Sequence, residues 1–531
     1  MVTSTTSSDD VLIVGSGINS LVCAALLARS GRKIRMLERE FTLGGCLRTD
    51  ELTLPGLRHD TLATAHPMFL AGPAYSALGG ALHDAGLRYC NTDLPTGVLL
   101  PDGRHLALST SREVNRASFD AAHAGDGQVL HAVLKEMTIR VPLVFSLLGN
   151  ELWRLRTAKS LASIAWKEGL GALVDFFGSA LGSARTWLEQ DFRSDLPAAL
   201  LAPWALHCGL GPDAPLSALM AKVVAFTLEQ AGMPMVQGGA ANAVRAFEQL
   251  IRDARGQMHT GVDVVRIVVE RGRAVGVQTA DGREYRAREV ICNVTPTQLY
   301  TRLLEPQCVP PEVLRQARQW RYGKGNMQIH LALSQSPKWP DSSLNRVAYM
   351  HLTGGVNAVS RAVNEAERGL LPAQPTICVA QPSTVDPSRA SEGRHILWIQ
   401  VPECPREPIG DAAGILEVSA DQGWTVALRE AYADRVVETI ARQIPNLRES
   451  ILGRVVLSPR DLQQMNMNLV GGDPYGGDCS LDQSFLWRPL RAVRNHETPI
   501  AHLWHIGAST HPGPGLGGGS GFHIAQVLGA A

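Results

Sequence analysis

The chain has 531 residues, more than one hydrophobic core usually serves, so we expect two or more domains. Apolar residues make up 45% of the sequence and charged residues 19%, which is typical of a soluble globular protein. Lys plus Arg and Asp plus Glu number 50 each, so the formal net charge is zero. This balance gives no reason to expect a nucleic-acid-binding surface.

The nine cysteines are scattered and include no CxxC pair. This pattern favours reduced thiols over a disulfide framework or a zinc site, and we expect no bound metal. The first ten residues, MVTSTTSSDD, lack the basic start and apolar core of a secretory signal, and no uninterrupted run of 18 apolar residues occurs. We therefore expect a cytoplasmic protein and leave peripheral membrane contact open.

Residues 11–38, VLIVGSGINSLVCAALLARSGRKIRMLE, have the pattern of a strand, a glycine turn, a helix and a second strand. The apolar runs 11–14 and 34–37 are those of strands buried on both faces. Between them, apolar residues recur at helical spacing up to a glycine that can end the helix. The pattern predicts a βαβ unit of the kind that binds a dinucleotide.

Four residues of this unit are candidate cofactor ligands. Gly15 permits the tight turn, and Gly17 lets the backbone approach a pyrophosphate held at the N-terminus of the helix. Ser20 replaces the third glycine of the usual pattern and is small enough for close helix–strand packing. Glu38 lies 21 residues after Gly17, where a carboxylate accepts hydrogen bonds from the ribose hydroxyls and favours a ribose without a 2′-phosphate.

After this unit come the glycine pair Gly44 and Gly45, an acidic turn and the run PGLRHD at residues 55–60. These features in this order resemble the flavin amine oxidase superfamily, specifically its phytoene desaturase and carotenoid isomerase branch. The resemblance implies FAD as the cofactor, with the glycine pair beside it. Cys46 stands where the family usually has an arginine that contacts the FAD phosphates, and Arg48 is the nearest substitute.

Two later blocks point the same way. Residues 237–295 hold a glycine pair before a helix, two strands joined by a turn, and a buried strand ending at Asn293. In the resembling family such a block returns to the cofactor domain, and Val264 matches a valine whose backbone contacts the adenine. Near the C-terminus a strand ends at Gly507, and a glycine-rich turn leads into a helix. The resemblance places this turn under the flavin, and its cofactor-binding candidates are Gly507, Gly515, Gly518 and Gly519.

The fold class that follows is α/β, with a Rossmann-like FAD-binding domain assembled from separated segments and a substrate domain of mixed sheet and helices. We expect residues 11–67 and 468–529 to pack into one domain although they lie at opposite ends of the chain. The expected divisions are FAD-binding segments at 1–86, 231–296 and 466–531, a helical substrate or membrane-contacting region at 87–230, and a substrate domain at 297–465.

Within the helical region, apolar residues dominate 141–181, with basic residues interleaved: Arg154, Arg156, Lys159 and Lys167. Two interpretations stay open, an ordinary helical subdomain and a membrane-contacting patch that admits a lipophilic substrate. In the substrate domain, residues 326–333 alternate between polar and apolar, which predicts a strand with one solvated or cavity-facing side. His330 on that side is a catalytic candidate.

Two further catalytic candidates are His66 and His511, each of which precedes a proline. Proline restricts the preceding residue to an extended conformation, which would aim each imidazole reproducibly. The family resemblance places both loops beside the flavin, where either histidine could accept the proton lost from the carbon next to the hydride donor. The other interpretation is that both histidines only cap nearby backbone groups.

These features predict an FAD-dependent dehydrogenase or desaturase that transfers a hydride from a largely apolar small molecule to flavin N5 and forms a C=C or C=N bond. Only one dinucleotide fingerprint is visible, so we expect reoxidation by oxygen or a quinone rather than at an NAD(P)H site. The alternatives are a non-redox FAD isomerase, an amine oxidase, and an FAD-binding module that serves in assembly. The sequence does not indicate the substrate, the electron acceptor or the oligomeric state.

Overall fold

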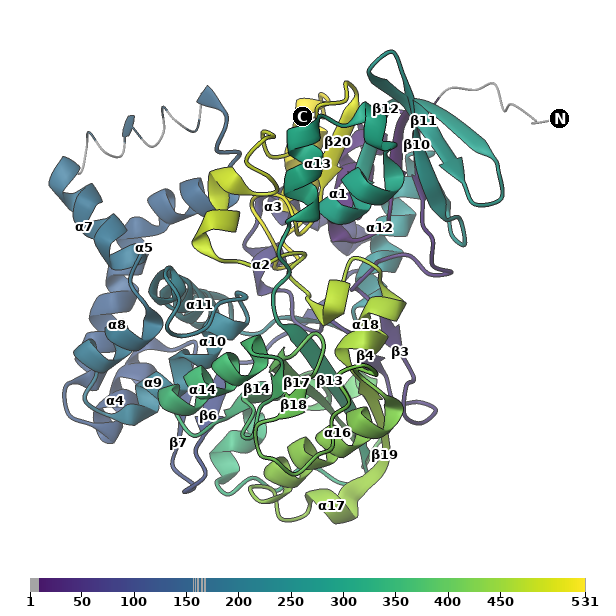
Figure 1. Cartoon of the computed structure of the whole chain (residues 1–531). Coiled ribbons are helices and arrows are strands. Elements are labelled where there is room, and N and C mark those ends of the chain that lie inside the picture. Colours follow the sequence, from purple (N-terminus) through teal and green to yellow (C-terminus); the bar gives the residue numbers. More distant parts are fainter. Residues whose placement is uncertain are drawn as a thin grey trace.

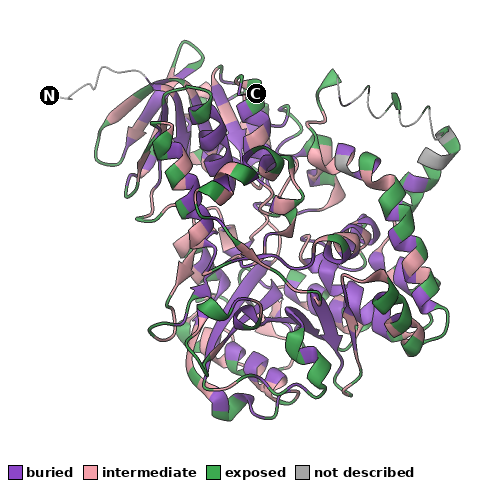
Figure 2. Cartoon of the chain, turned by 180° about the vertical axis from the view of Figure 1, so that it is seen from behind, coloured by how far each residue is buried: buried purple, intermediate pink, exposed green. Residues whose placement is uncertain are grey.

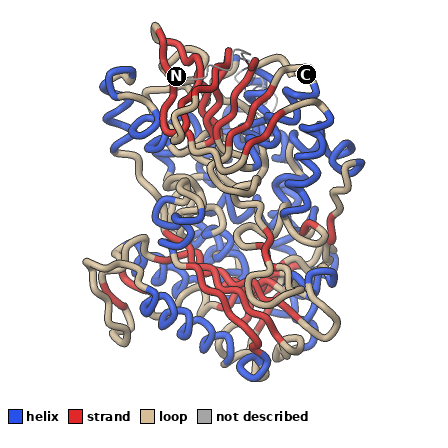
Figure 3. Tube along the Cα trace, turned by 90° about the vertical axis from the view of Figure 1, so that its right-hand side faces the viewer, coloured by secondary structure: helices blue, strands red, loops and turns tan. Residues whose placement is uncertain are grey.

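The computed structural model describes residues 9–530 except 156, 158, 160, 161, 164, 165, 167 and 168. Arg156 and Lys167, two of the interleaved basic residues named above, lie outside the described residues. Two sheets form separate layers, one above the other (Figures 1 and 3). Helices lie around both sheets, and those of residues 112–149 and 170–191 project together to the left in Figure 1. The central strands of both sheets are largely buried (Figure 2). This mixed α/β architecture confirms the expected fold class.

The first sheet has a parallel core of five strands in the order β20-β12-β1-β2-β9. The strands are β1 (Asp9–Val14), β2 (Ile34–Leu37), β9 (Gln257–His259), β12 (Glu284–Asn293) and β20 (Leu503–Ile506). A hairpin of β10 (Val264–Glu270) and β11 (Arg273–Thr279) pairs antiparallel with the start of β12. The sheet thus draws strands from the beginning, the middle and the end of the chain.

The two faces of the first sheet bury alternate residues of β1, as expected for a strand covered on both sides. Ile13 packs with α1 (Ile18–Arg29), α3 (Pro73–Asp84), α12 (Ala241–Asp253) and α19 (Gly519–Val527). Leu12 packs on the other side with the π-helix η1 (Gln298–Leu303) and with α13 (Pro311–Arg318). Residues 298–318 therefore pack on the first sheet, although they lie beyond 296, where we expected the FAD-binding segment to end.

The second sheet has the strand order β19-β13-β17-β16-β14-β6-β7. Its strands are β6 (Thr96–Leu99), β7 (His105–Leu108), β13 (Gly325–Leu333), β14 (Tyr349–Leu352), β16 (Ile377–Ala380), β17 (His395–Cys404) and β19 (Ile451–Leu457). Strands β6 and β7 fall inside the region 87–230 that we expected to be helical. They are short and apolar, and pairing of β6 with β14 decides their conformation.

One face of the second sheet is apolar and packs on α16 (Val426–Ala441). The opposite face, which we call the inner face, carries a mixture of polar and aromatic side chains: Asn326, Gln328, His330, Tyr349, His351, Cys378, Trp398 and Gln400. Strand register places them on one side, because Gln328, Gln400, Cys378 and His351 pair directly across four strands. All nine residues of β13 are buried, so the strand has no solvated side, and of the two expected possibilities only a cavity-facing side stays open. Other elements cover that side.

Helices cover the inner face and project beyond it. They are α4 (Arg112–Ala122), α5 (Asp126–Gly149), α7 (Leu170–Ala180), α8 (Ala184–Asp191), α9 (Asp195–Leu201), α10 (Pro203–Leu206) and α11 (Ser217–Ala231). The remaining elements are β3 (Thr49–Asp50), β4 (His59–Asp60), α2 (Pro67–Leu70), β5 (Tyr89–Cys90), β8 (Met235–Val236), η2 (Pro306–Cys308), η3 (Ser342–Arg346), α14 (Val356–Glu367), β15 (Leu370–Leu371), α15 (Pro382–Val385), η4 (Pro387–Arg389), β18 (Gly410–Asp411), α17 (Leu447–Ser450), α18 (Pro459–Met465), η5 (Val470–Gly472), η6 (Leu481–Gln483) and η7 (Phe485–Trp487).

A fully buried arginine joins the two layers. The Arg389 guanidinium lies 2.5 Å from Asp60 Oδ2 and 3.2 Å from Asp386 Oδ2, and it donates to the Val236 carbonyl at 2.9 Å. The two carboxylates also accept from backbone, Asp60 from Ala240 N–H and Asp386 from Gly238 N–H. Burial opposes the charge of Arg389, but the two carboxylates raise its pKa. Sequence reasoning did not identify this triad.

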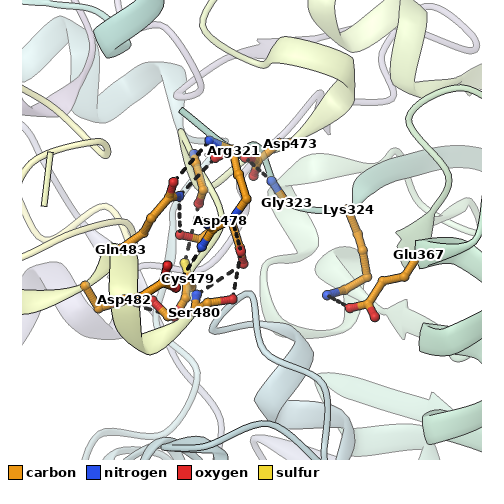
Figure 4. A network of polar contacts seen from close by, with 12 residues as sticks. Arg321, Gly323, Lys324, Glu367, Asp473, Asp478, Cys479, Ser480, Asp482 and Gln483 are labelled. Carbon is orange, nitrogen blue, oxygen red and sulfur yellow. Dashed lines mark hydrogen bonds and ion pairs between the residues drawn. The ribbon is translucent and has the colours of Figure 1, made fainter. Parts of the chain in front are cut away.

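The chain passes between the two layers at residues 321–323, before β13, and at residues 473–483, before β20. These two segments are hydrogen-bonded to each other (Figure 4). Asp473 is buried and accepts from the backbone N–H groups of Gly323, Tyr475 and Gly477 at 2.7–2.9 Å. The Gln483 side chain binds the first of these segments at Arg321, because it accepts from Arg321 N–H and donates to Arg321 C=O, each at 3.1 Å. The chain that enters β13 therefore lies against the chain that returns to β20.

We predict that Arg389→Ala lowers the free energy of unfolding by about 3–5 kcal/mol, because it leaves two buried carboxylates without their cation. Urea denaturation followed by circular dichroism measures the change. Arg394→Ala is the matched control, since Arg394 is exposed nearby and should change stability by less than about 0.5 kcal/mol. An Arg389 variant as stable as the control would contradict the structural role given to the triad.

Candidate flavin site

The glycine turn after β1 closes around Asn293 at the end of β12. Gly15 has a φ of +87°, and a Cβ there would lie 3.2 Å from the Asn293 carbonyl oxygen. A Cβ on Gly17 would lie 3.2 Å from Asn293 Nδ2, which donates to Ser20 Oγ at 2.9 Å. The small residue at position 20 therefore serves both packing and hydrogen bonding. No side chain caps the N-terminus of α1, so its first N–H groups are available to an anion.

Glu38 is buried at the end of β2 and is held by the turn. Its carboxylate accepts from Ser16 N–H at 2.8 Å, from Ser16 Oγ at 2.6 Å and from Glu40 N–H at 2.9 Å. Ser16 Oγ in turn accepts from Gly44 N–H at 3.0 Å. The acid thus lies beside the glycine turn, at the position that binds the adenosine ribose in dinucleotide folds.

The glycine pair packs directly on this turn. A Cβ on Gly45 would lie 3.2 Å from Gly17 Cα, and one on Gly44 would lie 2.6 Å from a Val244 methyl group. Arg48, the candidate phosphate contact, forms an ion pair with Asp50 at 2.5 Å. Burial raises the pKa of the Cys46 thiol to about 11, so no charge replaces the family's arginine at that position.

The C-terminal glycines bring a second helix end to the same place. Gly507 has a φ of +117° and a Cβ there would meet Asn293 Oδ1 at 2.4 Å. Gly515 has a φ of +118°, which disfavours other residues, although the space beside it is open to within 3.7 Å. Gly518, at φ +69°, is the N-cap of α19, and a Cβ there would lie 2.7 Å from a Val22 methyl group. A Cβ on Gly519 would lie 2.8 Å from Pro512.

The N-terminal turns of α1 and α19 touch each other. Gly521 N–H donates to Asn19 Oδ1 at 3.2 Å, and a Cβ on Gly521 would lie 1.8 Å from the Asn19 carbonyl. Two positive helix ends therefore converge, an arrangement that suits a pyrophosphate with two negative charges. Sequence reasoning did not single out Gly521, although the close helix crossing depends on it.

Val264 lies beside the ribose-binding position. It is buried at the start of β10, and Val262, two residues earlier, donates its N–H to the Glu38 carbonyl at 2.8 Å. The backbone of this strand is therefore near the place where an adenine would follow the ribose. Glu38, the paired helix ends and this strand together fit the adenosine diphosphate part of FAD.

The three catalytic candidates have different surroundings. The rings of His59 and His330 lie 5.3 Å apart, and the charge of Asp60 acts on both His330 and His66. His511 donates from Nε2 to the Asn150 carbonyl at 3.0 Å, and its backbone N–H donates to Asn495.

All three imidazoles are neutral at pH 7. Burial lowers the pKa of His66 and of His330 to about 4, and that of His511 to about 3. A base with such a low pKa accepts a proton weakly at neutral pH. His66 also departs from the extended conformation expected before proline, with φ −126° and ψ 37°, because it begins helix α2.

The converging helix ends, the acid after β2 and the shared sheet define a protein that binds a dinucleotide-like cofactor. The sequence model of the flavin containing amine oxidoreductase family matches residues 21–447, so the chain belongs to this family. It is a flavin-dependent oxidoreductase, and FAD is its cofactor.

Individual proteins of known sequence or structure resemble the chain over nearly its whole length. The Mus musculus protein named pyridine nucleotide-disulfide oxidoreductase domain-containing protein 2 is 26% identical over 98% of this chain and 93% of its own. The neurosporene-forming phytoene desaturase of Cereibacter sphaeroides is 23% identical over 96% of this chain and 92% of its own. A solved structure of a triple mutant of putrescine oxidase shares the fold, with a TM-score of 0.61 at 17% identity over 98% of both chains.

We predict that Glu38→Ala weakens FAD binding by about 1–3 kcal/mol, which is roughly 5- to 150-fold in the dissociation constant. The reason is the loss of a charged acceptor at the ribose. Flavin fluorescence during titration of the apoprotein measures the affinity. Glu40→Ala is the control, because the Glu40 side chain pairs with Arg39 rather than with the turn; equal affinities in the two variants would refute the role of Glu38.

Proposed function

We propose that this oxidoreductase dehydrogenates a largely neutral, apolar small molecule, with loss of a hydride and a proton from adjacent atoms and formation of a C=C or C=N bond. Bound FAD supplies the hydride acceptor for such a reaction. The observation that carries the proposal is the chemistry of the inner face, where aromatic rings stand beside neutral amides.

Aromatic side chains line the inner face. The Tyr349 ring lies 5.8 Å from that of Trp398 and 6.3 Å from that of Trp204. Beside them, both amide atoms of Asn326 and the Oε1 atom of Gln328 are buried without a hydrogen-bond partner among the described residues. Leaving such an atom unsatisfied costs about 1–3 kcal/mol, so these amides indicate where a bound molecule supplies partners.

Charge favours a neutral substrate over an ammonium ion. Burial lowers the pKa of His330 and of His351, so both imidazoles of the inner face are neutral at pH 7. Both oxygens of the nearby Asp60 carboxylate already accept hydrogen bonds, Oδ2 from Arg389 and Thr64 and Oδ1 from Ala240 and Thr49. Neither oxygen is therefore free to pair with an ammonium ion. An ammonium ion would leave water here without an anionic partner, which is costly. The inner face therefore suits dehydrogenation of a neutral compound better than oxidation of an amine.

The relatives support dehydrogenation without deciding the substrate. One is named a phytoene desaturase, and a structural neighbour is named a putrescine oxidase. We retain reoxidation by oxygen or a quinone as part of the proposal. A non-redox isomerase is the main alternative, and the same experiment distinguishes it.

The decisive experiment is anaerobic mixing of the FAD-loaded protein with an acyclic polyene, a monoterpene and a small cyclic amine, each tested separately. Loss of the oxidised-flavin absorption with a hydrocarbon supports the proposal. Loss with the amine alone would identify an amine oxidase. Conversion of a substrate to an isomer, with the flavin still oxidised and no electron acceptor present, would identify the isomerase.

We predict that His66→Ala and His511→Ala each retain FAD and slow anaerobic flavin reduction by less than about 100-fold, because imidazoles with such low pKa values are poor bases. Stopped-flow absorbance at the flavin band measures the rate. A loss of about 100-fold or more with FAD retained would instead identify that histidine as the general base.

We also propose that the chain contacts membranes peripherally through exposed apolar side chains of α5, of α7 and of the described residues between them. Exposed apolar side chains cluster there, including Ile139 at 63%, Trp166 at 87% and Val174 at 63% exposure. Among the described residues, none of the helices is both long and apolar enough to cross a bilayer. The exposed apolar side chains, rather than a spanning helix, are the basis of the proposal, and through them a lipophilic substrate would enter from one surface of a bilayer.

We predict that the protein sediments with phosphatidylglycerol-containing vesicles and that the double substitution Trp166→Glu and Val174→Glu lowers the bound fraction several-fold, because it places charge on the apolar patch. A vesicle co-sedimentation assay measures the fraction. Val426→Glu is the control, since Val426 is 66% exposed at the start of α16, outside the patch. Equal vesicle binding by the unmodified protein, the double variant and the Val426→Glu control would refute membrane contact through this surface.

A further inference from the structure

Three side chains with metal-binding atoms meet at the inner face, on the side covered by α10. They are His207 at the C-terminal end of α10, His351 on β14 and Cys378 on β16. Their nearest ligand atoms, one nitrogen from each histidine and the Cys378 sulfur, all lie within 4.8 Å of one another. The two histidine Nε2 atoms are only 2.9 Å apart.

Sheet register and aromatic packing create this cluster. His351 and Cys378 are direct partners in the antiparallel pair of β14 and β16, so their side chains point to the same face. Trp204 positions the third group, because its ring lies 4.6 Å from that of His207 and 5.1 Å from that of His351. Trp204 is itself anchored by a hydrogen bond from Nε1 to Thr96 at 3.3 Å.

We propose that His207, His351 and Cys378 form a binding site for a thiophilic transition-metal ion, represented by Zn²⁺. Two imidazole nitrogens and a thiolate are a ligand set that suits such an ion and disfavours Mg²⁺ or Ca²⁺. Tetrahedral coordination at about 2.0–2.1 Å for Zn–N would separate the two nitrogens by roughly 3.3 Å. The 2.9 Å separation needs only a small opening to reach that geometry.

The protonation states allow coordination. Burial lowers the pKa of both histidines, so both rings are neutral and each has one lone pair on nitrogen. The shared Nε2 contact requires one ring to donate and the other to accept. On binding, the donor ring moves its proton to Nδ1, so that both Nε2 lone pairs face the ion. Burial also keeps the Cys378 thiol protonated, and formation of the metal–sulfur bond releases that one proton.

A fourth ligand is available beside the cluster. Gln400 pairs directly with Cys378 across β16 and β17, and its buried Oε1 has no hydrogen-bond partner among the described residues. Directly opposed residues in an antiparallel pair have Cβ atoms about 4.5–5.5 Å apart, within reach of one ion. His207 is only partly buried, which gives the ion a path from the surface. We expected no bound metal because the cysteines include no CxxC pair. This site takes only one of its ligands from a cysteine, so that spacing does not bear on it.

The test is titration of the FAD-loaded, chelator-treated protein with Co²⁺, followed by competition with Zn²⁺. We expect one Co²⁺ per chain, with the intense visible absorption of a tetrahedral site at longer wavelengths than the flavin bands and a thiolate-to-cobalt charge-transfer band. Zn²⁺ should displace it. Cys378→Ser should abolish the charge-transfer band and weaken binding by about 100-fold or more, beyond what loss of an outer-shell partner causes.

Cys404→Ser is the matched control, because Cys404 is an equally buried thiol of the same sheet that packs on the α16 side. It should leave cobalt binding unchanged. If Cys378→Ser does not fold, His207→Gln provides the same test at a partly exposed position. Octahedral or non-stoichiometric Co²⁺ spectra in the unmodified protein, or spectra unaffected by the folded variant, would overturn the proposal. This test does not depend on turnover, so it stands apart from the proposed dehydrogenase activity.

Discussion

The contact on which the rest of the structure depends is the buried ion pair of Arg389 with Asp60 and Asp386. A charge removed from water is tolerated only when it is paired and its remaining hydrogen bonds are satisfied. Asp60 and Asp386 meet this requirement by also accepting from Ala240 and Gly238, which lie just before α12 of the cofactor layer. The same pair fixes residues 59–62 over the inner face, where the Leu62 carbonyl accepts from Trp398 Nε1 at 3.0 Å. These contacts therefore fix the position of the first sheet and its helices relative to the second sheet.

Within the cofactor layer, Asn293 organises the site in a comparable way. Its backbone and amide contact the turn at Gly15 and Gly17, the serine of α1 and the glycine that ends β20. Asn468 adds a further hydrogen bond to the Asn293 carbonyl. One residue at the carboxyl end of a central strand thus joins three segments that are hundreds of residues apart in the chain. The convergence of the two helix ends follows from this arrangement, and a diphosphate is the group that it suits.

The inner face of the second sheet, the proposed substrate surface, carries buried polar groups that packing alone does not require. A sheet covered on both sides would gain more from apolar residues at Asn326, Gln328 and Gln400, whose unsatisfied amides cost free energy. Such a cost is typical of binding sites, where local rules are broken for a ligand. Neutral imidazoles and aromatic rings complete the proposed substrate surface, which suits a ligand recognised by shape and hydrogen bonding more than by charge.

The sequence by itself determined the local units: the βαβ unit at residues 11–38, the acid at its end, the glycine-rich C-terminal turn and hence the flavin-dependent class. These features are readable because each depends on residues close together in the chain and on a backbone conformation that few residues permit. Only the tertiary structure decided that β6 and β7 join the second sheet, that residues 298–318 pack on the first, and that the three candidate histidines are buried. It also decided the pairing of Arg389 with Asp60, 329 positions away, and the meeting of His207, His351 and Cys378. Such contacts depend on strand register and packing between distant segments, and no local pattern encodes either.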